Sequence, residues 1–236
     1  IGCNKNSHDK KIQNTNIDFH YESEISTDNI QIDDVLSFST FGENIILTGY
    51  SILKGETVYI DGVEIPVVMS NLKSIYFDNK GKLINEIIID TSNENCNAEI
   101  GAYDKNGDFW AVYLYPSPIL THYSKEGKYI ENITLNDFDY YFMSNANFVI
   151  DNDMNFYFYE QNKLSVYDNN GSLIFSNTHS DGGFENGGVF KLFDGSIITK
   201  KFDNDGTKKT ISFNEIDLSK KSFGSEYITN STTNGN

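Results

Sequence analysis

Short runs of strand-forming residues alternate with polar turns along most of the chain. In residues 163–177, KLSVYDNNGSLIFSN, two such runs flank the turn Asp-Asn-Asn-Gly. Gly171 supplies the positive φ that a hairpin loop built from a type I turn and a bulge requires. Asp168 opens the turn with a side chain that binds the backbone further along the turn. The pattern predicts a β-hairpin over these residues.

The same hairpin pattern occurs three times at a steady spacing. The copies are YFDNKGKLI, HYSKEGKYI and VYDNNGSLI, at residues 76–84, 122–130 and 166–174. Their glycines, which are 46 and 44 residues apart, are Gly81, Gly127 and Gly171. Regular spacing of this kind indicates one structural unit copied along the chain.

A second series of turns lies between these hairpins. It comprises AYDKNGDFWAVYLY, VIDNDMNFYFYE and LFDGSIITKKF, which start at residues 102, 149 and 192. The aspartates that open these turns, 47 and 43 residues apart, are Asp104, Asp151 and Asp194. Two hairpin series that share one period predict a four-stranded antiparallel unit of about 45 residues, repeated along the chain.

A four-stranded repeat of this length is typical of a β-propeller blade. Neighbouring blades cover both faces of each sheet, which explains why strands such as FWAVYLY and NFYFYE carry bulky residues on both sides. A β-sandwich or a meander of unrelated hairpins is the alternative, and it accounts for the turns but not for their matched spacing. We therefore predict an all-β fold, a β-propeller of four-stranded antiparallel blades.

About four such units fit into residues 31–228. The first unit carries an insertion, KGETVYIDGVEIPVV, which is itself a small predicted hairpin that turns at Asp61-Gly62. Because rings of only four blades are uncommon, we expect a partial ring, either the front of a larger protein or an arc that another copy completes. Residues 1–30 are expected to form a flexible polar tether, and residues 229–236 a disordered tail.

Composition and charge agree with a folded β protein and narrow its partners. Hydrophobic residues make up 38% of the 236 and aromatic residues 14%, which is enough for a core. The 17 Phe and 15 Tyr, together with abundant Ile, favour strands. The formal charge of −16 repels phosphate backbones, so we expect no nucleic-acid partner. The sequence contains no run of about 18 apolar residues, so it predicts no transmembrane helix.

The first residues resemble the end of a bacterial lipobox, in which a small residue precedes a cysteine that receives a diacylglyceryl group. Here Gly2 precedes Cys3, and a polar segment follows. We expect acyl chains on Cys3 to anchor the protein at the outer face of the cell membrane. An ordinary thiol is the alternative. Cys96 is expected to be unpaired and buried, and without a Cys-x-x-Cys or Cys/His cluster the chain has no disulfide framework.

The lipobox, the polar tether, the strand pair around FGENIILTGY and the repeated YD-x-x-G-x-L-I hairpins resemble the extracytoplasmic propeller regions of low-GC Gram-positive lipoproteins. Over about residues 1–230, the chain is similar to the propeller that some solute-binding lipoproteins of ABC transporters carry in front of the binding domain. NHL-type propellers share these turns. The resemblance implies an extracytoplasmic, membrane-anchored protein that is accessory to solute uptake.

Two turns offer oxygen ligands at alternate positions, as calcium loops do. They are DKNGD, with Asp104, Asn106 and Asp108, and DNDMN, with Asp151, Asp153 and Asn155. The twelfth position of an EF-hand loop holds Glu, whereas this chain has Tyr115 or Asn162 there. We therefore expect the aspartates to cap turns, with calcium as the alternative, and we predict no cofactor.

Motifs for catalysis are incomplete throughout the sequence. AYDKNGDFW lacks the spacing and the Thr of a sialidase Asp-box, DGGFENGG lacks the Gly-Lys-Ser/Thr of a phosphate loop, and no Gly-x-Ser-x-Gly elbow occurs. The histidines are scattered, and Trp110 is expected in the core rather than in a sugar-binding platform. We predict a non-enzymatic protein that binds a small molecule, a glycan or a protein partner. A glycan-active propeller enzyme with two carboxylates at the central channel, or a sensor ectodomain, is the alternative.

Overall fold

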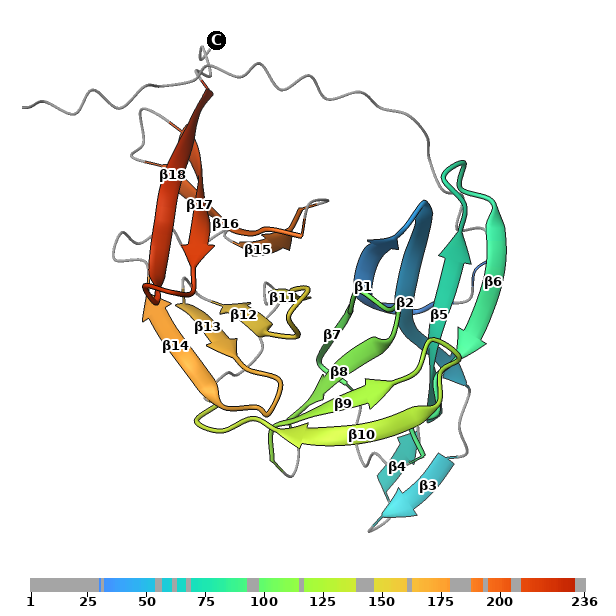
Figure 1. The fold of residues 1–236 in the computed structure, drawn as a ribbon. Helices are drawn as coiled ribbons and strands as arrows, with labels where there is room; N and C mark the ends of the chain where they lie inside the picture. The colour runs from blue at the N-terminus through green and yellow to red at the C-terminus, as the bar shows by residue number, and fades with distance from the viewer. Residues whose placement is uncertain are drawn as a thin grey trace, which may run out of the picture.

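The computed structural model contains four four-stranded antiparallel sheets arranged as the blades of a β-propeller (Figure 1). It describes residue 30 and residues 32–53, 57–60, 63–66, 69–92, 98–114, 117–138, 147–160, 163–178, 188–192, 195–204 and 209–231. The all-β class and the four-stranded blades predicted from the sequence are confirmed. Within these ranges, no helix is long and apolar enough to cross a membrane.

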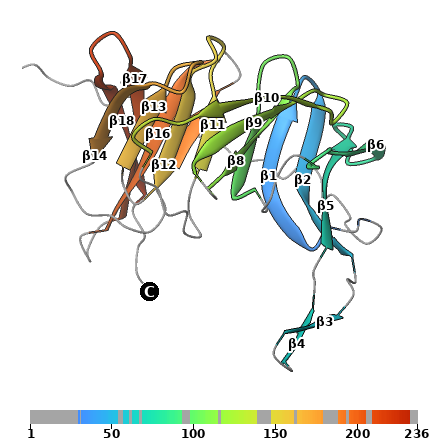
Figure 2. The same cartoon turned by 90° about the horizontal axis from the view of Figure 1, so that it is seen from below.

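Blades 1 and 2 are meanders whose first strand lies nearest the centre (Figures 1 and 2). Blade 1 consists of β1 (Asp34–Phe41), β2 (Asn44–Leu53), β5 (Met69–Phe77) and β6 (Leu83–Ile88). Blade 2 consists of β7 (Ile100–Tyr103), β8 (Phe109–Tyr113), β9 (Ile119–Tyr123) and β10 (Tyr129–Thr134). The predicted insertion in blade 1 is the hairpin of β3 (Thr57–Ile60) and β4 (Val63–Pro66).

Blades 3 and 4 repeat the same strand order. Blade 3 consists of β11 (Asn147–Ile150), β12 (Phe156–Glu160), β13 (Lys163–Tyr167) and β14 (Leu173–Thr178). Blade 4 consists of β15 (Gly188–Lys191), β16 (Ile197–Asn204), β17 (Lys209–Asp217) and β18 (Ser222–Ser231). The prediction that the tail begins at residue 229 is wrong. β18 continues to Ser231, and Thr229, Asn230 and Ser231 pair with β17.

Three predictions fall on residues outside the described ranges. They concern the tether over residues 1–29, the lipid anchor at Cys3 and the burial of Cys96. Asp194, the third aspartate of the second turn series, also lies outside these ranges.

The hydrophobic core lies between neighbouring blades. One cluster joins blades 1 and 2 around Ile46 and Phe109, a second joins blades 2 and 3 around Trp110 and Phe158, and a third joins blades 3 and 4 around Val189. Every residue of β8 and β12 is buried, whereas most residues of the outer strands β6 and β10 are exposed. The bulky residues on both faces of the middle strands therefore fill the spaces between sheets, as predicted.

Two of the three repeated hairpin glycines, Gly127 and Gly171, lie where one blade touches the next. Gly127 and Gly171 have φ of +79° and +77°. The Gly127 carbonyl accepts a hydrogen bond from Asp90 N at 2.7 Å, and the Gly171 carbonyl accepts one from Asn136 N at 3.0 Å. Both donors follow the outer strand of the preceding blade. A Cβ at Gly171 would overlap the Thr134 carbonyl oxygen of that strand. We call these two contacts the blade joints.

The blades follow one another as an arc with blades 1 and 4 at its ends (Figures 1 and 2). The innermost strands pack in sequence, β1 against β7, β7 against β11 and β11 against β15. Among the described residues, no comparable packing joins β15 to β1. The four innermost strands thus follow one another along the inner side of the arc.

Replacement of Gly171 by Ala is expected to destabilise the protein much more than replacement of Gly42. Gly42 also has a positive φ, of +61°, but its Cβ would meet nothing within 4 Å. Gly42→Ala should therefore cost only the conformational term, about 1 to 2 kcal/mol. Gly171→Ala should cost about 2 kcal/mol more, because the new methyl group overlaps the preceding blade. Urea unfolding of both variants measures the difference, and equal losses would contradict the role of the joint.

Candidate functional site

A cavity of about 490 Å³ lies at the centre of the innermost strands. Its walls come from β1, β7, β11 and β15, and from the turns that follow them. Those turns contribute Gly42, Lys105, Asn152 and Leu192. All four blades therefore contribute to one site, which we call the central cavity.

Apolar side chains are exposed on the wall of the central cavity. Phe38, on β1, is 65% exposed, which is unusual for an aromatic residue in a strand. Phe41 and Leu192 line the same space and are also exposed. A ligand in the cavity would bury this apolar surface.

Two lysines from different blades line the central cavity. Lys105 belongs to the turn after β7, and Lys191 is the last residue of β15. The Lys105 ammonium donates a hydrogen bond of 2.7 Å to the carbonyl of Asn152 and so connects blade 2 to blade 3. Among the described residues, none forms a hydrogen bond or an ion pair with the Lys191 ammonium.

The environment of Lys191 disfavours its charged form. Burial of the half-buried side chain lowers its pKa, and the Lys105 charge acts in the same direction. The carboxylates of Asp151 and Asp104 oppose this shift without reversing it. A bound anion would relieve the cost of holding this ammonium group away from water.

Asp104, a candidate calcium ligand, caps the turn between β7 and β8. One carboxylate oxygen accepts hydrogen bonds from Asn106 N at 2.7 Å and Asp108 N at 3.1 Å. The other accepts a hydrogen bond from Trp110 Nε1 at 3.1 Å. Asp104 is only 3% exposed, so these bonds compensate for the burial of the carboxylate. The predicted capping role of Asp104 is confirmed.

Asp151 repeats this arrangement in blade 3. One of its oxygens accepts hydrogen bonds from Asp153 N and Asn155 N, both at 2.8 Å. The other accepts hydrogen bonds from the Asn155 amide and from the Tyr157 hydroxyl, also at 2.8 Å. Burial raises the pKa of Tyr157, and its bond to Asp151 adds to this shift. Turn capping is thus confirmed here as well, and calcium binding stays a prediction.

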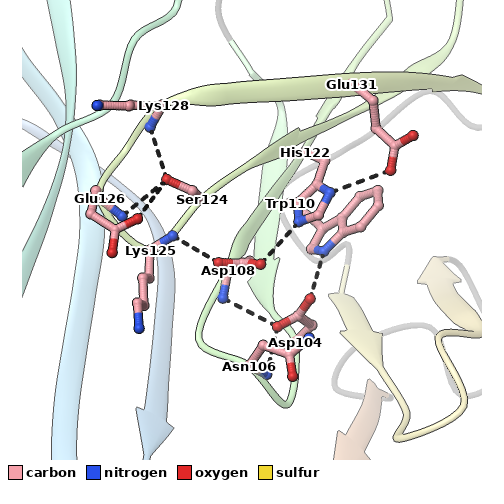
Figure 3. A network of polar contacts seen from close by, with 10 residues as sticks. All are labelled: Asp104, Asn106, Asp108, Trp110, His122, Ser124, Lys125, Glu126, Lys128 and Glu131. Carbon is pink, nitrogen blue, oxygen red and sulfur yellow. Dashed lines mark hydrogen bonds and ion pairs between the residues drawn. The ribbon is translucent and has the colours of Figure 1, made fainter.

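His122 joins two of the candidate residues in a cluster that the sequence did not reveal (Figure 3). It is opposite Trp110 across β8 and β9, and the two rings stack with centroids 3.9 Å apart. His122 Nε2 lies 3.3 Å from Asp108 Oδ2, and Nδ1 lies 3.4 Å from Glu131 Oε1. Ligand atoms of Asp104, Asp108 and His122 all lie within 4.8 Å of one another. The donor set of two carboxylates and one imidazole could hold a divalent metal ion.

A second, more open depression of about 790 Å³ lies between blades 3 and 4. Carboxylates dominate its polar wall, among them Asp153, Glu215 and Asp217. Hydrogen bonds from Lys220 and Ser219 lower the pKa of Asp217 to about 2, so this carboxylate is already compensated. The central cavity is therefore the stronger candidate site, because its lysine lacks such a partner and all four blades shape its wall.

Comparisons with known proteins show likeness only at the level of the fold. No protein-family model matches the chain, and no curated protein does. Among solved structures, a protein of unknown function from Dyadobacter fermentans matches with a TM-score of 0.49 and 10% identity, over 84% of this chain and 64% of that one. A protein of unknown function from Bacteroides caccae matches with a TM-score of 0.44 and 9% identity, over 81% of this chain and 71% of that one.

The major allergen Mala s 1 of Malassezia sympodialis matches with a TM-score of 0.44 and 9% identity, over 84% of this chain. The chain spans 64% of the length of this allergen and of the Dyadobacter protein. The assignment of the propeller rests on the strand order and blade arrangement described above.

Removal of the Asp104 carboxylate is expected to destabilise the protein more than removal of Asp168. Asp168 makes the same two backbone bonds at 2.9 Å in an exposed turn, where water can replace it. Asp168→Ala should cost about 1 kcal/mol. Asp104→Ala leaves the indole N–H of Trp110 and two backbone N–H groups unsatisfied and should cost about 3 kcal/mol.

Urea unfolding followed by the fluorescence of Trp110, the single tryptophan, measures both losses. If Asp104→Ala proved no more destabilising than Asp168→Ala, the hydrogen bonds of the buried carboxylate would not contribute to stability as predicted.

Proposed function

We propose that this β-propeller is a non-enzymatic binding module whose ligand occupies the central cavity. The observation that carries the proposal is the composition of the cavity wall, where exposed apolar side chains stand beside an ammonium group without a partner among the described residues. Ligand sites of soluble proteins are mostly apolar cavities of about 300 to 1,000 Å³ with a few polar groups that orient the ligand. The central cavity, at about 490 Å³, fits this description.

The strands that surround the cavity favour a preformed site. β7 and β11 are each packed between two other innermost strands. Lys105 further connects the turns of blades 2 and 3 through its bond to Asn152. Such a wall loses little conformational entropy on binding, because its backbone is already fixed.

A glycan-active enzyme is the competing function, and the carboxylates near the centre argue against it. Hydrolysis of a glycosidic bond uses two carboxyl groups, one of which donates a proton to the leaving oxygen. Asp104 and Asp151 belong to the turns beside the cavity, but both oxygens of each accept hydrogen bonds, from the turn itself and from the strand that follows it. The carboxylate oxygens are thus engaged in holding the turns, which gives both residues a structural role rather than one toward a glycosidic oxygen.

We also propose that the protein acts outside the cytoplasm, anchored to the outer face of the cell membrane through Cys3. The lipobox-like Ile1-Gly2-Cys3 and the polar segment after it support this placement. The turn pattern shared with propellers of solute-binding lipoproteins supports a role accessory to ABC-type solute uptake. A sensor ectodomain with the same fold would use the same cavity for its signal.

Binding in the central cavity is tested with N-phenyl-1-naphthylamine, a neutral apolar dye whose fluorescence rises in apolar surroundings. The native protein should bind the dye, and Phe38→Ser should weaken binding about tenfold, because the apolar contact of one aromatic side chain is lost. Ile130→Ser is the matched control, since Ile130 is 46% exposed on β10 and does not line the cavity. Absence of binding, or equal effects of the two substitutions, would refute the proposed site.

The anchor is tested by mass spectrometry of the protein isolated from the membranes of its native host. The expected result is a diacylglyceryl group on Cys3, and Cys3→Ser should release the protein from the membrane fraction. An unmodified Cys3 in the native protein would refute the anchor.

A further inference from the structure

The balance of charged residues at the central cavity differs from that of the whole chain. The chain carries 34 acidic and 18 basic residues. Among the described residues that line the cavity are two lysines, Lys105 and Lys191, and one acidic residue, Asp104, and the Asp151 carboxylate also acts on Lys191. Asp104 already accepts three hydrogen bonds from its own turn and from Trp110. These bonds engage both oxygens of Asp104 without removing its charge, so the described wall is much less acidic than the chain as a whole, and Lys191 is its ammonium group without a described partner.

Lys191 is the charged group in this wall that a bound anion would stabilise most. Its side chain is half-buried, and no described residue pairs with its ammonium. Lys105, by comparison, is exposed and donates to Asn152. A partly desolvated ammonium group is stabilised strongly by an anion that reaches it, because the surrounding protein screens the attraction less than water does.

The apolar wall restricts what such an anion can be. Phe38, Phe41 and Leu192 line the same cavity as Lys191, and each has an exposed apolar side chain. A small inorganic anion would leave this surface in contact with water, whereas an apolar body attached to the anionic group would cover it. Nucleic acid is disfavoured as the source of the anion by the charge of −16.

We propose that the central cavity binds a small organic anion, an apolar or aromatic body with one carboxylate or comparable group, and that the Lys191 ammonium is its counter-ion. The inference rests on the proposed function, since it names the class of ligand for the same cavity. The body of the ligand lies against Phe38 on β1, and the anionic group points toward β15.

The surroundings of Lys191 set the direction in which binding of an anion depends on pH. Among the described residues, Asp151, Asp104 and Lys105 are the charged groups that act on Lys191. Because burial lowers the pKa of Lys191, its ammonium loses its proton at a lower pH than an ordinary lysine does. Binding of an anion should therefore be strongest near neutral pH and should fall as the pH rises through the pKa of Lys191.

Two dyes that differ in a single group test the inference. 8-Anilinonaphthalene-1-sulfonate has the same aromatic body as N-phenyl-1-naphthylamine and adds an anionic sulfonate. Lys191→Met should weaken binding of the sulfonate about tenfold and leave binding of the neutral dye within about twofold, because methionine keeps the apolar stem and removes the charge. Lys191→Arg, which keeps the charge, should retain sulfonate binding. Lys128→Met removes a charge from an exposed turn and should change neither affinity.

The outcomes separate the inference from the proposed function. If both dyes bind and both depend on Phe38 but neither depends on Lys191, the anion inference is wrong and the cavity remains a binding site. Equal loss of both dyes in Lys191→Met would also overturn the inference, because the effect would then not concern charge. If neither dye binds the native protein, the proposed function fails together with the inference. Matching urea midpoints of the variants confirm that the comparison is made on folded protein.

Discussion

The arrangement of the blades depends on a contact that leaves no room for a side chain. At Gly171, the hairpin of blade 3 approaches the outer strand of blade 2 so closely that a Cβ would overlap the Thr134 carbonyl. Gly127 makes the same approach to blade 1, where its Cβ would meet the carbonyl of Ile88. Each joint is completed by a hydrogen bond from the preceding blade. Gly127 and Gly171 are therefore required both for the turn inside a blade and for the distance between blades.

The blade joints lie at the outer strands, and polar contacts of other strands and turns also connect neighbouring blades. The Tyr103 hydroxyl of blade 2 bonds to Thr48 and Ser74 of blade 1 in a buried position, and Lys105 connects blade 2 to blade 3. Neutral hydroxyl groups satisfy one another there, so burial raises the pKa of Tyr103 without creating an unpaired charge. These contacts join the blades whose innermost strands line the central cavity. They support the proposal that the central cavity is a preformed site.

The fold could be predicted from the sequence because turns and strands depend on residues that are close together in the sequence. Gly81, Gly127 and Gly171 need a positive φ, and the bulky residues of β8 and β12 need cover on both faces. The site could not be predicted in the same way. Lys191 and Phe38 belong to no motif, and they line one cavity only because the arc of blades places β15 and β1 around the same centre. His122 lies beside Asp108 through the pairing of β8 with β9, which spacing alone does not reveal.

The central claim, that the blade joints hold the propeller together, is tested most directly by native-state hydrogen exchange of two amides. The N–H groups of Asp90 and Asn136 follow outer strands and lie in exposed residues, yet they donate to Gly127 and Gly171. The account predicts that they exchange as slowly as the buried amides of β8 and β12, because both require the blades to separate. Exchange at the rate of an unprotected exposed amide would contradict the account.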